Sequence, residues 1–172
     1  MFWKLKDKAA WLKTIADLLP DEAVQSMQYL PQHREGFSCY HHSLLVSYVS
    51  FRFAALLGWR SSEAARGGLL HDLYLYNWKD RSLHTAKDHL KNHAQQALEN
   101  AESRFLLTAR EKDIIVTHMF PLTHTFYHYK ESFLVSTVDK LCAVAELLNI
   151  LPEDLTAPVA LPGGYWPQTQ VG

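Results

Sequence analysis

The chain has 172 residues, which is enough for one domain with a substantial hydrophobic core and too few for two domains of ordinary size. Its 17 basic and 18 acidic residues nearly cancel, which argues against a broad surface for nucleic acid or for an anionic membrane. The two cysteines, Cys39 and Cys142, form no C-x-x-C pair, and no apolar run is long enough to span a membrane. We therefore expect a cytoplasmic protein with reduced thiols.

The first half of the chain shows the apolar spacing of helices. Short helices are expected over 11–19 and 21–30, the second capped by Asp21. A longer helix is expected over 43–57, ending at Gly58, with its apolar side made of Leu45, Val46, Val49, Phe53 and Leu56. The next helix should be capped by Ser61 or Ser62 and should run to His71-Asp72.

The second half continues the helical pattern after an aromatic loop over 73–86. Helices are expected over 89–101, from the Thr108–Glu111 capping box to about His118, and over 131–149. The apolar side of the last helix is predicted from Phe133, Leu134, Val138, Leu141, Ala145 and Leu148. No stretch alternates as a strand would, so we predict an all-α fold. We expect one helical domain over 1–150 and a Pro/Gly-rich C-terminal arm over 151–172.

Histidines and aspartates fall at the ends and interiors of these helices. They are His42, His71, Asp72, His93, His118 and Asp139. Imidazole and carboxylate are the ligands that borderline divalent metals prefer. Asp139 stands among apolar residues of its own helix, where an unpaired carboxylate would cost several kcal/mol. The sequence predicts a centre for one or two divalent ions (Mn, Fe, Zn, Ni, Co or Mg), with Asp72 able to bridge two of them.

The order of these residues resembles the H…HD…H…H…D pattern of the HD-domain superfamily of metal-dependent phosphohydrolases. The resemblance covers about Tyr40 to Glu146 and is closest to small single-domain bacterial HD proteins. It implies a helical bundle in which His42, His71, Asp72 and Asp139 hold one metal, while Asp72, His93 and His118 hold a second. The resemblance favours His42 over His41 as the ligand, because His42 stands directly before Ser43 and the apolar helix, as the family's first histidine does.

The resemblance implies hydrolysis of a phosphomonoester or phosphodiester in a nucleotide or other small phosphorylated metabolite, with metal-bound hydroxide as the nucleophile. Asp72 and Lys140 are the expected catalytic residues. Further side chains could contact substrate, although a solvated surface position explains each of them equally well or better: Arg66, His89, His124, His128 and Lys130. The aromatic run after Asp72, which includes Tyr74, Tyr76 and Trp78, is either core or a stacking surface for a nucleobase. No G-Y-P signature is present, so hydrolysis of cyclic dinucleotides is not expected.

Two other functions fit the same residues. A similar six-residue set holds a di-iron pair in certain HD-fold oxygenases, and imidazole and carboxylate do not distinguish iron from the other metals. The metal could also act only as a structural staple in a non-catalytic helical module. The expected partner is a small phosphorylated substrate, with no nucleic-acid polymer and no membrane. The oligomeric state is left open, with a homodimer as one option.

Overall fold

The computed structural model describes residues 8–32, 37–77, 79–80 and 85–151, without the side chains of 86–91. Across these residues the chain forms α-helices and no β-strand, apart from one isolated antiparallel bridge between Pro31 and Ser38. The all-α prediction is confirmed. The helices are α1 (Lys8–Ile15), α2 (Glu22–Ser26), α3 (Cys39–Leu56), α4 (Ser61–Leu70), α5 (Ala86–Glu102), α6 (Ala109–Thr117) and α7 (Lys130–Leu147), with a 3-10 turn, η2, over Met27–Tyr29. The predicted arm lies outside the described residues, except for Leu151.

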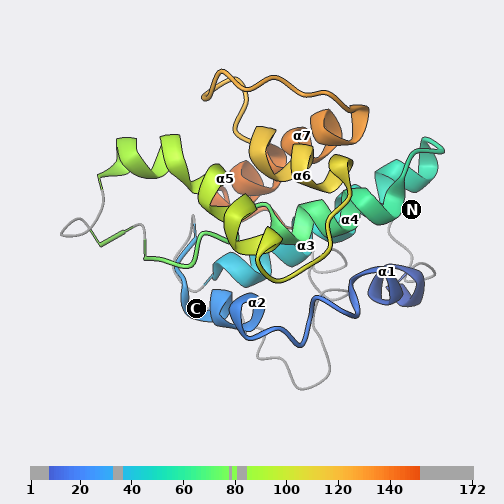
Figure 1. Cartoon of the computed structure of the whole chain (residues 1–172), viewed down its shortest axis with the longest axis horizontal. Coiled ribbons are helices and arrows are strands. Elements are labelled where there is room, and N and C mark those ends of the chain that lie inside the picture. The colour runs from blue at the N-terminus through green and yellow to red at the C-terminus, as the bar shows by residue number, and fades with distance from the viewer. Residues whose placement is uncertain (1–7, 33–36, 78, 81–84, 152–172) are drawn as a thin grey trace.

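Helices α3 and α4 occupy the middle of the bundle. Figure 1 shows α1 and α2 on one side of this pair and α5, α6 and α7 on the other. Helix α7 runs antiparallel to α3, because His42 near the start of α3 contacts Glu146 near the end of α7. At the opposite end, the backbone N–H of Arg60 donates to Glu131 in the first turn of α7. The two longest helices therefore lie side by side along the core.

Helix α4 is held close to its neighbours by two adjacent glycines. A Cβ at Gly67 would come within 2.6 Å of the Ile114 side chain on α6, and a Cβ at Gly68 would lie 3.1 Å from the Ser47 Cα on α3. A side chain at Gly67 would force Ile114 to move, and one at Gly68 would press on the backbone of α3, so α4 packs directly against the two helices. As a result α4 ends in the interior of the bundle, where the next two residues are His71 and Asp72.

Hydrogen bonds at the helix ends confirm some sequence predictions and correct others. Asp21 caps α2, and Thr108 forms the predicted capping box of α6. Gly58 adopts the left-handed conformation (φ 66°) expected after α3. The predicted serine cap of α4 is wrong: Arg60 is the N-cap residue and has no side-chain cap bond, while Ser61 is the first helical residue. Helix α3 begins earlier than predicted, after a cap by Ser38.

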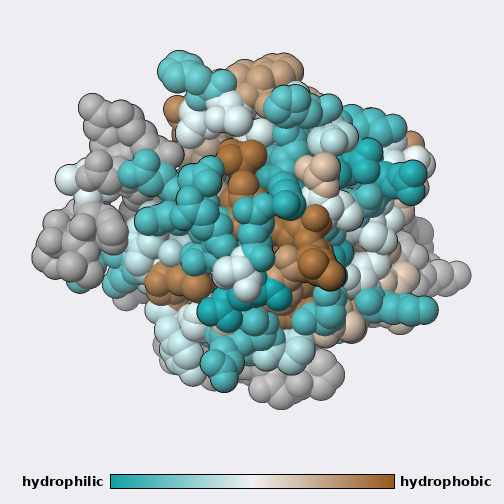
Figure 2. All heavy atoms as spheres, in the orientation of Figure 1, coloured by the Kyte–Doolittle hydropathy of each residue, from teal (hydrophilic) through white to brown (hydrophobic). Residues whose placement is uncertain are grey.

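The predicted apolar side of α7 is right in part: Val138 is buried and Leu134 and Ala145 are partly buried, but the other three predicted residues face outward. Phe133, Leu141 and Leu148 are more than half exposed. The buried side of the helix instead carries Glu131, Ser132, Val135, Ser136, Val138, Asp139, Cys142 and Glu146. Phe53 and Leu56, predicted on the inner side of α3, are exposed as well. In the described chain we find no helix with both the length and the apolar character to cross a membrane. The face drawn in Figure 2 is largely hydrophilic, with smaller hydrophobic groups near its centre.

Candidate metal centre

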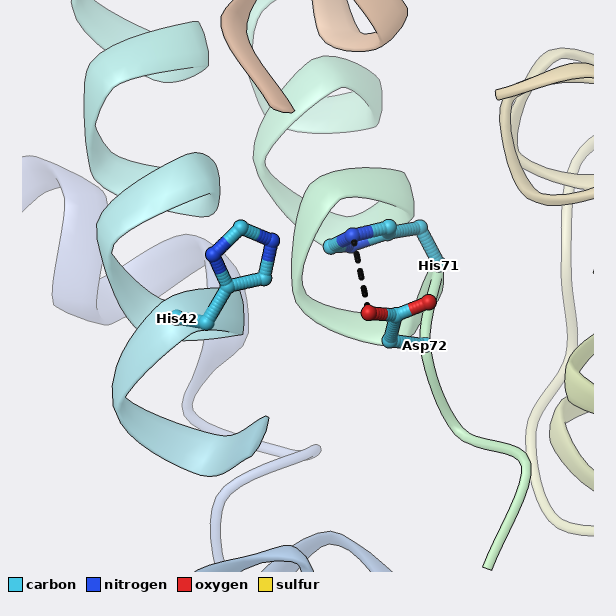
Figure 3. Close-up of side chains that lie close together, drawn as sticks. All are labelled: His42, His71 and Asp72. Carbon is cyan, nitrogen blue, oxygen red and sulfur yellow. Dashed lines mark ion pairs between the residues drawn. The ribbon is translucent and has the colours of Figure 1, made fainter. Parts of the chain in front are cut away.

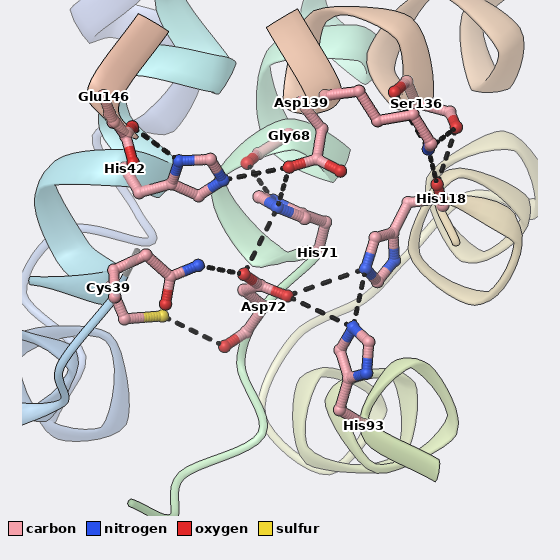
Figure 4. Close-up of polar contacts among 12 residues, drawn as sticks. Cys39, His42, Gly68, His71, Asp72, His93, His118, Ser136, Asp139 and Glu146 are labelled. Carbon is pink, nitrogen blue, oxygen red and sulfur yellow. Dashed lines mark hydrogen bonds and ion pairs between the residues drawn. The ribbon is translucent and has the colours of Figure 1, made fainter. Parts of the chain in front are cut away.

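The six predicted ligand residues meet in the interior of the bundle (Figure 4). They come from separate elements: the first turn of α3, the end of α4, then α5, the end of α6, and the middle of α7. Each is at most 8% exposed. Two groups of three have donor atoms that all lie within 4.8 Å of one another and could hold a metal ion: His42, His71 and Asp72 (Figure 3), and Asp72, His93 and His118.

The first group is completed by Asp139. His42 Nε2 lies 2.9 Å from Asp139 Oδ1. His71 Nε2 lies 3.5 Å from the same oxygen and 3.6 Å from Asp72 Oδ2. The two longer distances exceed those of a good hydrogen bond to a carboxylate. They resemble the roughly 3.0–3.4 Å that separates neighbouring ligands around an ion with ligand distances near 2.1 Å. The donor atoms of this group therefore suit a shared divalent cation.

The second group uses the other oxygen of Asp72. Asp72 Oδ1 lies 3.6 Å from both His93 Nε2 and His118 Nε2, and these two nitrogens are 3.0 Å apart. The two oxygens of one carboxylate therefore face two different sets of imidazole nitrogens. That placement allows Asp72 to bridge two ions.

Hydrogen bonds on the far side of the rings orient two of the histidines. His71 Nδ1 is 2.8 Å from the Gly68 carbonyl, and His118 Nδ1 is 2.7 Å from the Ile115 carbonyl. A carbonyl only accepts, so in the neutral ring Nδ1 carries the hydrogen and Nε2 keeps its lone pair. Among the described residues, the buried Nε2 of His71 has no hydrogen-bond partner. When the ring is neutral, the Nε2 lone pair lies between two carboxylates, which is the position that a metal ion would fill.

Glu146 supports His42 and was missed by the sequence analysis. Its Oε1 lies 2.7 Å from His42 Nδ1, and its carboxyl group is fully buried on α7. The other oxygen, Oε2, has no hydrogen-bond partner within the described part of the chain. A buried carboxylate behind a histidine is a typical means of fixing a metal ligand. The available signal was the seven-residue spacing from Asp139, which places both carboxylates on one side of α7.

A second support reaches Asp72 from the segment before α3. Gln32 is buried, and its Nε2 donates to Asp72 Oδ2 at 2.7 Å. The Tyr74 hydroxyl donates to Gln32 Oε1 at 3.1 Å, which fixes the orientation of the amide. Tyr74 is therefore part of the core, with its hydroxyl turned inward. The more exposed Tyr76 ring packs against Tyr74 at 4.9 Å and is the better candidate for contact with a substrate.

In the first group, the pKa values of His42, His71 and Asp139 depend strongly on the charges of their neighbours. Burial lowers the pKa of His42, but Glu146 and Asp139 outweigh it and hold this pKa well above the usual 6.5. Burial likewise lowers the pKa of His71, and Asp72 and Asp139 raise it above its usual value. Burial raises the pKa of Asp139, but His42 and His71 bring it well below the ordinary range. The carboxylates thus favour the protonated forms of both histidines, so a cation that binds here competes with protons.

His118 differs from these two histidines. Burial, together with the nearby His71 and His93, lowers the pKa of His118 to about 3. The ring is therefore neutral at physiological pH and can donate its Nε2 lone pair without first losing a proton.

Lys140 lies beside the centre, and its ammonium group is occupied by backbone and hydroxyl oxygens. Its Nζ donates to the His118 carbonyl at 2.7 Å and to the Ser136 hydroxyl and carbonyl oxygens at 2.7 and 3.2 Å. Burial lowers the pKa of this amine, while Asp139 acts in the opposite direction. In this arrangement Lys140 ties the end of α6 to α7 and so helps to position His118.

The expected substrate contacts lie mostly away from the centre. Arg66 pairs with Asp17, which follows α1, and with Glu111 in the first turn of α6, two turns before His118. Its guanidinium group is therefore engaged away from the metal groups. Lys130 lies over the Trp59 ring, about 13 Å along α7 from Asp139. The remaining three are His128, which pairs with Asp113, His124, which is exposed, and His89, whose side chain lies outside the described residues.

Comparison of the chain with protein-family models, with curated proteins and with solved structures gave no match. The argument for function therefore rests on the residues of this chain and on their arrangement.

Proposed function

We propose that this protein is a metal-dependent phosphohydrolase of the HD type, acting on a nucleotide or another small phosphorylated metabolite. The observation that carries the proposal is the position of Asp72, whose two oxygens face two separate sets of imidazole nitrogens in the interior of the bundle. Two divalent ions held by these residues would suit in-line displacement at phosphorus, because one ion could activate the attacking oxygen and the other could stabilise the leaving oxygen.

Some residues would bind the ions directly, and others orient the side chains that bind them. His42, His71 and Asp139 would take one ion, His93 and His118 the other, and Asp72 would contact both. A bound divalent cation would supply Lewis acidity and a water of lowered pKa. The chain itself contributes ring orientation through Glu146, Gly68 and Ile115, and a buried setting in which charge interactions are stronger than in bulk water.

The position of Tyr76 supports a small substrate. This tyrosine is only partly buried, and burial together with the Asp72 charge raises its pKa to about 12. Its hydroxyl therefore keeps its proton at physiological pH and can donate to a phosphate or ribose oxygen. Asn77 beside it is exposed and offers a further polar contact.

The proposal is tested by stripping the protein with a chelator, reloading it with Mn, Co, Ni, Mg or Fe, and screening phosphomonoesters, phosphodiesters and nucleotides. Asp72→Asn should reduce any activity by at least about 1,000-fold, since one change removes a ligand from both ions. Glu102→Gln, an exposed carboxylate paired with Lys112, is the matched control and should leave activity unchanged. Activity that survives Asp72→Asn would exclude this centre as its source.

The same metal-reloaded protein also tests the two alternative functions, a di-iron oxygenase and a non-catalytic module with a structural metal. Iron-dependent uptake of oxygen without release of phosphate would identify an oxygenase. A metal that binds tightly and stabilises the fold, with no exchangeable water and no turnover under any condition, would identify a structural staple.

A further inference from the structure

The outward side of α7 is apolar and exposed. Five large side chains, each 52–65% exposed, make up this surface: Phe133, Leu141, Val144, Leu147 and Leu148. At 100° per residue they fall within an arc of about 120° on the side of the helix opposite Asp139. We call this surface the α7 outer face. It lies apart from the metal centre, which α7 meets with its inward side.

The α7 outer face carries almost no charge. Between residues 131 and 150 the acidic side chains are Glu131, Asp139 and Glu146, and all three are buried on the opposite side. Of the two lysines of α7, Lys140 directs its ammonium group toward His118 and Ser136 on the inside of the bundle, and Lys130 lies over the Trp59 ring at the first residue of the helix. Two copies of this surface could therefore meet without bringing like charges together.

The exposed area is of the size that a stable dimer needs. With about 100 Å² for the exposed part of each side chain, the α7 outer face presents on the order of 500 Å², near the upper limit for an unpartnered monomer patch. Phe53, Leu56 and Leu57 near the end of α3, the antiparallel neighbour of α7, are also exposed. An interface that covers them as well as the α7 outer face would bury about 800 Å² of apolar surface, the usual contribution of one partner to a specific interface.

We propose that the α7 outer face is the interface of a homodimer with two-fold symmetry. A two-fold axis near Leu141 would pack α7 antiparallel to its copy, so that Phe133 of one chain meets Leu148 of the other. The apolar positions 141, 144 and 148 are three or four residues apart, and Thr137 continues the same spacing back to Phe133, so this face can pack against another helix over most of its length. The neutral, self-complementary surface favours a second copy of the chain over a charged partner.

The test measures the mass of the full-length protein by sedimentation between 1 and 100 µM. The wild type should be a dimer, and Leu141→Glu should raise the dimer dissociation constant at least 100-fold by placing two carboxylates together at the axis. Leu106→Glu changes an exposed leucine between α5 and α6 and is the matched control, which should stay dimeric. A monomeric wild type, as expected if residues 152–172 cover this face within one chain, would overturn the proposal.

A mixing experiment separates loss of the interface from loss of the fold. Leu141→Glu and Leu141→Lys should each be monomeric with an unchanged circular dichroism spectrum, and an equimolar mixture should form a heterodimer. If either variant fails to fold, the same pair of charges at Val144 is used, since that side chain is half exposed. Failure of folded, oppositely charged variants to associate would contradict a two-fold contact through this face.

Discussion

Glu146→Gln should weaken metal binding without removing any metal ligand. Glu146 Oε1 lies 2.7 Å from His42 Nδ1, so the change replaces a charge-assisted hydrogen bond with a neutral one and makes the imidazole a weaker donor. Loss of such a supporting carboxylate typically costs 10–100-fold in metal affinity, or about 1.4–2.7 kcal/mol. We expect this loss in competition titrations against a chromogenic chelator at pH 7.5.

A second buried glutamate on the same helix provides the control. Glu131 is as buried as Glu146, but it accepts hydrogen bonds from the Arg60 backbone and the Arg110 guanidinium, away from the metal centre. Glu131→Gln should therefore lower the free energy of unfolding by about 1–3 kcal/mol and leave metal affinity unchanged. Equal metal affinities for the two variants would refute a supporting role for Glu146.

Three further outcomes are expected. In the metal-free protein, His42 and His71 have pKa values above 6.5, so their contribution to stability is present below that pH and is lost as pH rises through the raised values. Thermal melts with a chelator should therefore show falling stability from pH 6 to pH 9. Thermal melts of the metal-loaded protein should not show this fall in stability. Calorimetry should detect the protons that are released on metal binding. Gln32→Leu should lower metal affinity at pH 7.5, as measured by chelator competition, because Asp72 Oδ2 loses its 2.7 Å donor; an unchanged affinity would show that Asp72 needs no such support. Gly68→Ala should destabilise the protein by about 1–3 kcal/mol in urea titrations, because the added methyl group meets the Ser47 backbone at 3.1 Å; a gain in stability, as expected for alanine in an open helix, would mean that α3 and α4 can separate.

Much of the fold could be predicted from local signals. The capping residues Asp21 and Thr108 and the helix end at Gly58 act over three or four neighbouring residues, so the sequence alone is sufficient to place them. The convergence of the six metal-site residues was expected from their order along the chain. The supporting residues Gln32 and Glu146 were not found, because their partners lie 40 and 104 positions away. The seven-residue spacing of Glu146 from Asp139 indicates a shared side of α7, but it does not reveal the contact with His42.

Two sequence predictions for α7 were incompatible. Apolar spacing placed Leu141 on the buried side, and the metal-site prediction placed Asp139 there. Leu141 lies about 200° from Asp139 around the helix, so both could not be buried. The structure resolves the conflict in favour of the polar side. Ser136 and Glu146 have partners on α6 and α3, respectively, and these contacts are available only if that side faces the bundle.

The placement of polar residues on the inward side of α7 and of large apolar residues on its outward side connects the candidate metal centre to the proposed dimer. In an ordinary surface helix the apolar stripe covers the core and the charged residues face water. On α7 the inward side must carry Asp139 as a predicted ligand and Glu146 behind His42, so the large apolar residues Phe133, Leu141 and Leu148 lie on the outside. Exposed leucines at helical spacing would favour aggregation unless something covers them. On our two proposals this helix therefore has two partners: cations for its polar side and a second α7 for its apolar side.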